Sequence, residues 1–371
     1  MKLWKKAALI CGLVFLKLLL LYWGFLNFDF KAHPEESWLT TWSRWDSKAY
    51  RMIAEYGYRG APDAAPDYRD FLSHFPPLYP LTIKTVHAVP GITPVAAGVG
   101  ISFVSILLAS LLLYKLVMLD FGSERVAWLS VYFLNLFPTS YFTLAVYSES
   151  LFLLCTISAF YFLRRASYGG SAGFGFAAIL TRLAGVTLFP VYAYAWFKKR
   201  GLKNALLLAS PALGVLAYLW INTYYFGHPL FFMGEYQSNA FTGKKLIVPF
   251  SETLSVFKQF LLQSFDGKWD FNFMMRTGWG SIFTLFALAV TIVGINMRLP
   301  LEYTIYALGS ILFFVSFSRG VSNARYVLSV FPIFVILGRL KSRFAVGALL
   351  VSFLILLMYF TRFYVRGWWA F

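Results

Sequence analysis

Long apolar segments recur along almost the whole chain, and they are the feature that most restricts its fold. A bilayer core of roughly 30 Å is crossed by a helix of about 20 apolar residues, in which every backbone polar group is bonded internally. With 59% apolar, 20% aromatic and 13% charged residues, the chain lacks the polar surface of a soluble enzyme. We therefore predict an all-α polytopic membrane protein.

Eleven segments have the composition of membrane helices, two of them short. They lie near 7–26, 92–118, 126–143, 148–163, 172–181, 183–197, 204–226, 277–297, 302–317, 324–338 and 344–361. A further apolar stretch, 77–90, is bounded by prolines and contains Lys84 and His87, so we interpret it as a re-entrant or interfacial helix. One membrane domain, 1–371, is expected to carry every function, with no soluble domain attached.

Lysine and arginine cluster at the ends of the apolar segments, so the formal net charge of +17 indicates membrane topology rather than nucleic-acid binding. If 77–90 does not cross, the basic short loops share the side of the basic N-terminus. The positive-inside rule then predicts a cytoplasmic N-terminus and places two large loops, 27–91 and 227–276, on the outer face. Membrane lipids are the expected surroundings, and no nucleic-acid partner is expected.

Ionisable residues at the outer ends of the helices are candidate functional groups, because charge at membrane depth is costly. On the predicted topology they should converge on one outer cavity. They are Asp46, Glu55, Glu149, Arg182, Arg319 and Arg325. Asp46 begins an amphipathic helix whose aromatic side includes Trp42 and Trp45, and capping of that helix is the alternative role for its carboxylate.

Five sequence blocks occur in a fixed order: RWDSKAYRMIAEYGY, HFPPLYPL, FPTSYFTLAVYSESLFLL, ILTRLAG and ARYVLSVFPIF. Together they resemble the PIG-V-type mannosyltransferase family, over residues 44–334. This family belongs to the multispanning GT-C glycosyltransferases, so the resemblance implies a GT-C-like fold with a large first outer loop carrying amphipathic helices. It also implies an inverting transferase that takes a sugar from a polyprenyl-phosphate (dolichyl or undecaprenyl) monosaccharide on the outer or luminal face.

The resemblance has one departure. The family motif Trp-Asp-x-x-His-Tyr has a histidine where this chain has Ala49, just before Tyr50. The substitution removes a hydrogen-bonding group. The resemblance therefore does not determine which sugar is transferred or which acceptor receives it. We expect the acceptor to be a lipid-linked or envelope glycan.

Transfer to a hydroxyl with inversion needs a carboxylate to take the acceptor proton and cations to stabilise the departing phosphate. Asp46, carried over as the outer-loop aspartate of the family, is the predicted base. Arg182, Arg319 and Arg325 are the predicted phosphate ligands. Further substrate-binding candidates are Trp45, Tyr50, His74 and Glu149. Glu149 could instead pair with an arginine or favour a helix N-terminus, and His74 could be a satisfied boundary residue.

No metal or other cofactor is expected, since related GT-C enzymes mostly look metal-independent. The acidic cluster Asp63, Asp67 and Asp70 lies in a loop rich in proline and alanine, where solvation is the simpler role. A polytopic lipid or glycolipid transporter (a flippase) would share the composition, but it should show paired repeats that this sequence lacks. A non-catalytic membrane scaffold is the other alternative. The compact length favours the plasma membrane of a prokaryote over the endoplasmic reticulum.

Overall fold

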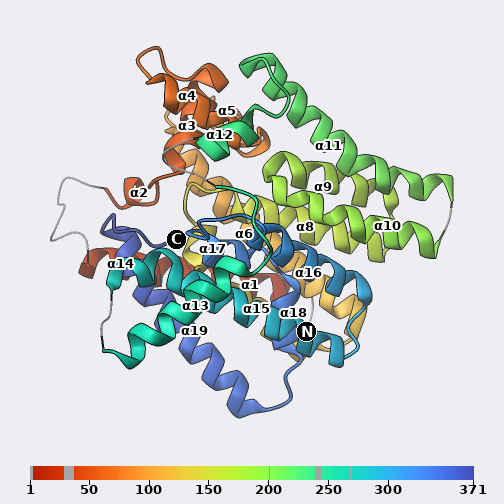
Figure 1. Ribbon diagram of the computed structural model, residues 1–371. Helices are drawn as coiled ribbons and strands as arrows, with labels where there is room; N and C mark the ends of the chain where they lie inside the picture. Colours follow the sequence, from red (N-terminus) through yellow and green to blue (C-terminus); the bar gives the residue numbers. More distant parts are fainter. Residues whose placement is uncertain (1–2, 29–36, 200, 239–243, 268–269) are drawn as a thin grey trace.

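The computed structural model describes residues 3–28, 37–199, 201–238, 244–267 and 270–371 (Figure 1). Regular structure in these ranges is helical, apart from one isolated antiparallel bridge between Leu246 and Phe317. The α-helices are α1 Leu3–Phe28, α2 Trp38–Thr41, α3 Ser47–Tyr56, α4 Pro66–Phe71, α5 Leu78–His87, α6 Pro94–Phe121, α7 Glu124–Leu136, α8 Glu149–Arg164, α9 Tyr168–Thr181, α10 Leu188–Lys198, α11 Leu202–Phe226, α12 Phe231–Ser238, α13 Ser251–Phe265, α14 Phe271–Phe273, α15 Trp279–Asn296, α16 Leu301–Val315, α17 Asn323–Leu328, α18 Pro332–Gly338 and α19 Arg343–Val365. Short 3₁₀ turns are η1 Gly57–Arg59, η2 Leu72–His74, η3 Ser140–Thr143 and η4 Leu183–Thr187, and a π turn, η5 Met274–Gly278, leads into α15.

Five helical segments of the described chain are long and apolar enough to cross a bilayer. They are Trp4–Gly24, Pro94–Phe121, Ala205–Phe226, Phe271–Asn296 and Arg343–Val365. Helix α16 is apolar but shorter, at 15 residues. The all-helical integral membrane protein expected from the sequence is thereby confirmed, whereas the eleven crossings stay a prediction.

Two segments expected as single helices are interrupted at prolines. The segment 126–143 is helical only as far as Leu136, before Pro138, and ends in the turn η3. The segment 324–338 is divided into α17 and α18, with Pro332 opening the second helix. Proline lacks an N–H group and its ring clashes with the preceding helical turn, so a helix ends before it. The second of these stretches contributes Arg325 and Tyr326 of α17 to the candidate site.

The proline-bounded segment 77–90 forms α5, which has ten residues. Ten helical residues rise about 15 Å, half of a bilayer core, so α5 is too short to cross. It packs against α3, α6 and α9. Figure 1 shows α3, α4, α5 and α12 gathered at one end of the molecule. Residues 29–36 of the predicted outer loop 27–91, and 239–243 and 268–269 of the predicted loop 227–276, lie outside the described ranges.

A buried lysine joins the first helix to the rest of the fold. Lys17 of α1 is 1% exposed, and its Nζ donates to Thr143 Oγ1 at 2.7 Å. Asn135 Oδ1 at 3.3 Å and the Ser140 carbonyl at 3.4 Å complete its partners. An ammonium group removed from water needs such acceptors, because an unpaired buried charge is very costly. Lys17 therefore fixes α1 against η3.

Replacing Lys17 with alanine is expected to destabilise the protein by about 2–4 kcal/mol, because packing is lost and three oxygens lose a donor. Thermal and denaturant unfolding of the purified protein in detergent measures the change. Lys5→Ala, at an exposed position of the same helix, should alter the free energy of unfolding by less than about 0.5 kcal/mol. Equal stability of the two variants would contradict this role for Lys17.

Candidate functional site

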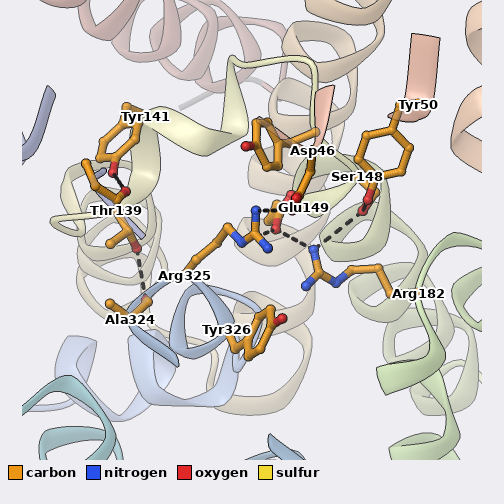
Figure 2. A network of polar contacts seen from close by, with 12 residues as sticks. Asp46, Tyr50, Thr139, Tyr141, Ser148, Glu149, Arg182, Ala324, Arg325 and Tyr326 are labelled. Carbon is orange, nitrogen blue, oxygen red and sulfur yellow. Dashed lines mark hydrogen bonds and ion pairs between the residues drawn. The ribbon is translucent and has the colours of Figure 1, made fainter. Parts of the chain in front are cut away.

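Two carboxylates and two arginines, drawn from separate parts of the chain, form a buried ion-pair network (Figure 2). Glu149 is fully buried, and its Oε1 pairs with Arg182 Nη1 and lies 3.3 Å from Arg325 Nε. Arg325 Nη1 in turn donates to Asp46 Oδ2 at 2.9 Å. Figure 2 shows both guanidinium groups converging on Glu149, with Asp46 beside Arg325. The structure thus brings four of the predicted site residues together.

Solvent reaches these four side chains unequally. The side chain of Asp46 is 29% exposed, compared with 15% for Arg182, 7% for Arg325 and none for Glu149. Asp46 occupies the N-cap position of α3, yet its side chain makes no capping hydrogen bond. Its carboxylate is directed to Arg325 instead of to the helix amides. Asp46 is consequently the more accessible of the two carboxylates in the network.

Arg182 is positioned by the end of α9. The residue follows Thr181 in an extended conformation, with φ −154° and ψ 137°, so its side chain leaves the helix surface. Turn η4 folds back so closely that a Cβ on Gly185 would lie 2.6 Å from the backbone nitrogen of Ile179. A glycine at 185 is therefore required for this junction, and the junction carries the guanidinium to Glu149.

Glu149 and Tyr50 are linked through a serine. The hydroxyl of Tyr50 is hydrogen-bonded to Ser148 Oγ at 2.8 Å, and Arg182 Nη1 donates to the same oxygen at 3.4 Å. Burial raises the pKa of the Tyr50 phenol above its ordinary value, so Tyr50 acts here as a neutral hydroxyl. Within the described part of the chain, the buried Oε2 of Glu149 accepts no hydrogen bond. An acceptor for a ligand hydroxyl is therefore present beside the two arginines.

Three cations surround the ring of Tyr326. Their distances from its centroid are 5.2 Å for Arg182, 5.2 Å for Lys244 and 5.5 Å for Arg325. Lys244 Nζ also donates to the Tyr326 hydroxyl at 3.4 Å. Counted with Asp46 and Glu149, these groups leave one uncompensated positive charge at the site. The arrangement is suited to bind an anion.

Lys244 was not among the residues expected from the sequence. It reaches Tyr326 because its segment pairs with 316–318: Ser318 N–H donates to the Lys245 carbonyl at 2.8 Å and Ile247 N–H to that of Ser316 at 2.9 Å. The sequence did contain an indication of this residue, because two adjacent lysines on a predicted outer loop are unusual under the positive-inside rule. Tyr326 and Ser148 had no comparable signal, although both lie within the quoted sequence blocks.

Three other predicted residues are not among the four side chains that form the ion pairs. Trp45 packs its ring against Tyr364 and Trp369. Arg319 is exposed, and its backbone N–H donates to Glu252 Oε2 at 2.7 Å. His74 Nε2 lies 3.1 Å from the carbonyl of Phe232 in α12. Their predicted substrate contacts stay predictions.

In the described residues no group of three or more His, Cys, Asp or Glu side chains is placed to hold a metal ion. The carboxylates of the network are instead engaged by arginines. Metal independence stays a prediction.

Comparison with known proteins gives only distant likenesses. No family model matches the chain, and no curated protein matches it. Among solved structures it is similar to ArnT from Cupriavidus metallidurans in the apo state, with 18% identity and a TM-score of 0.46 over 85% of this chain and 60% of that one. It is also similar to the apo oligosaccharyltransferase of Archaeoglobus fulgidus, with 12% identity and a TM-score of 0.45 over 100% of this chain and 57% of that one. The chain thus spans about three fifths of the length of either protein.

The stability of the protein should depend on pH through His74. Burial lowers the pKa of His74 from its ordinary value of 6.5 to about 4. The unfolded chain takes up this proton near pH 6.5, so the stability contributed by neutral His74 is complete above pH 6.5 and is lost as the pH falls towards 4. The loss should approach about 3 kcal/mol in unfolding experiments between pH 7.5 and 4.

His74→Gln, which keeps a donor for the Phe232 carbonyl, should show a shallower loss over the same pH range. The matched control is His228→Gln at an exposed position, which should follow the wild-type curve. Parallel curves for wild type and His74→Gln would exclude His74 as the titrating group.

Proposed function

We propose that this protein is an inverting GT-C glycosyltransferase of the PIG-V type, which transfers a hexose, with mannose as the first choice, from a polyprenyl-phosphate monosaccharide. The acceptor would be a hydroxyl of a lipid-linked or envelope glycan. The ordered sequence blocks between residues 44 and 334 support the family. The observation that carries the chemistry is the accessible Asp46 carboxylate beside a buried cluster with surplus positive charge.

In the proposed reaction the acceptor oxygen attacks the anomeric carbon while the bond from that carbon to the phosphate oxygen breaks. The acceptor proton passes to Asp46, and a single displacement inverts the anomeric configuration. Asp46 is preferred to Glu149 as the base because its side chain is 29% exposed, whereas Glu149 is fully buried and its Oε1 is paired with two arginines. Arg325 holds one oxygen of Asp46 and so orients the carboxylate.

The negative charge of the departing phosphate explains why cations are needed at the site. The donor is a phosphodiester with one negative charge, and the polyprenyl phosphate that leaves carries up to two. Positive groups fixed near the phosphate therefore bind the transition state more strongly than the ground state. Arg182, Arg325 and Lys244 would supply this stabilisation, while Glu149 Oε2 would accept a sugar hydroxyl.

The setting proposed for this reaction is the outer face of a prokaryotic plasma membrane, with the N-terminus in the cytoplasm and no bound metal. Ala49, which replaces the histidine of the family motif, is a fully buried residue of α3. Because the histidine of the motif is absent, the family does not determine the sugar or the acceptor. Purified protein in nanodiscs, assayed with a panel of polyprenyl-phosphate hexoses and a lipid extract, would identify both.

Asp46→Asn is expected to lower kcat by about 10²–10⁴-fold in this assay, because the isosteric amide cannot take the acceptor proton. The matched control is Glu55→Gln, which neutralises an exposed carboxylate on the same helix and should retain wild-type kcat. Full activity of Asp46→Asn would contradict the proposed base catalysis by Asp46. Sugar-lipid movement between leaflets without transfer would point to the flippase instead.

Lys244→Met should lower kcat/KM for the donor by about tenfold, since one phosphate contact worth roughly 1.5 kcal/mol is removed. Lys245→Met is the control, because the exposed Lys245 is joined to Ser318 through its backbone. The measurement is initial rate against donor concentration at fixed acceptor. Equal effects of the two substitutions would show that Lys244 acts only through the general charge of the loop.

A further inference from the structure

We infer that Trp45, Tyr364 and Trp369 form an aromatic clamp that positions Asp46 for base catalysis. Trp45 is thereby a positioning residue that acts through its neighbour in the chain. The inference rests on the proposed role of Asp46 as the base, and it adds a supporting role for residues 366–371, which follow α19.

The backbone immediately before Asp46 is strained. Trp45 has φ +44°, a left-handed conformation that a bulky side chain rarely adopts. The chain turns here, with Ser47 N–H donating to the Arg44 carbonyl at 3.0 Å and Lys48 N–H to that of Trp45 at 3.0 Å. A conformation of this kind persists only where the surroundings hold it in place.

The surroundings of Trp45 are aromatic. Its ring lies 5.2 Å from that of Tyr364 at 69°, and 5.5 Å from that of Trp369 at 60°. Tyr364 is fully buried and also stacks on Trp42 at 5.6 Å. Rings at these separations attract one another beyond the area they bury. Tyr364 thus contacts the chain at Trp42 and again at Trp45, directly before Asp46.

Hydrogen bonds fix the clamp from both sides. Arg44 Nη2 donates to the Val365 carbonyl at 2.9 Å, and the Tyr147 hydroxyl donates to the Arg44 carbonyl at 3.1 Å. The Tyr141 hydroxyl donates to the carbonyl of the buried Ala370, one residue beyond Trp369. The segment that carries Trp369 is therefore docked on the same turn, η3, that precedes Glu149.

The clamp explains why Asp46 does not cap α3. An N-cap residue that bonds the helix amides normally has an extended backbone, whereas Asp46 is helical, with φ −57° and ψ −22°. Its carboxylate consequently reaches Arg325. If Trp45 were released, Asp46 could become an ordinary N-cap, with its carboxylate turned to the amides of α3.

The test compares two neighbouring tryptophans. Trp369→Ala should lower kcat by about 10–100-fold and leave KM for the donor unchanged, because the base is displaced while the phosphate-binding cations stay in place. Trp369→Phe, which restores a ring, should recover kcat to within about threefold. Trp368→Ala removes a ring that is 55% exposed and contacts Phe271, and it should behave as wild type.

Asp46→Asn is assayed beside these variants so that the two proposals are judged separately. If Asp46→Asn is inactive and Trp369→Ala has wild-type kcat, the positioning role of the clamp is wrong, and the role of Asp46 as the base is retained. If Asp46→Asn is fully active, the proposed function fails first. Equal losses in Trp369→Ala and Trp368→Ala, or no recovery with Trp369→Phe, would also overturn the clamp.

Should Trp369→Ala not fold, Tyr141→Phe removes only the hydroxyl that holds the Ala370 carbonyl. A lowered kcat with unchanged KM supports the clamp in that variant, and wild-type kcat refutes it.

Discussion

The pairing of Glu149 with two arginines is the interaction on which the rest of this site depends. A carboxylate with no exposed surface is stable only when cations and hydrogen bonds replace its water. Arg182 comes from the junction of α9 and η4, and Arg325 from α17, so the ion pairs join both of these elements to the start of α8 at Glu149. Removing Glu149 would leave Arg182 buried without its carboxylate partner, at a cost of about 3–5 kcal/mol.

The groups of the site come from interruptions of the helical pattern. Arg182 is extended between two helices, Trp45 is left-handed before α3, and α17 is a six-residue helix that ends before Pro332. Thr139 Oγ1 donates to the Ala324 carbonyl at 3.2 Å, which fastens the start of α17 to the turn before α8 (Figure 2). Regular helices satisfy their own backbone and direct side chains around an axis, whereas these breaks direct several side chains to one point.

The sequence predicted the helices because apolar length is a local property, and it predicted the four ionised residues because charge near a bilayer is rare enough to be informative. From the sequence alone, Arg319 and Arg325 had the same predicted role as phosphate ligands. Only the start of α17 at Asn323 separates an exposed loop arginine from a buried one. Lys244 depended on pairing between 244–248 and 316–318, a contact about 70 residues apart that no local pattern encodes.

The contacts of Lys17 make the first helix more than a means of attachment to the membrane. A generic apolar helix of equal length would satisfy the bilayer, but it would leave Thr143 Oγ1 and Asn135 Oδ1 without the donor that Lys17 supplies. Those atoms belong to the stretch that turns the chain from α7 into α8. The first helix is therefore not interchangeable with other membrane helices, and chimeras that exchange it would have to carry a lysine at the same depth.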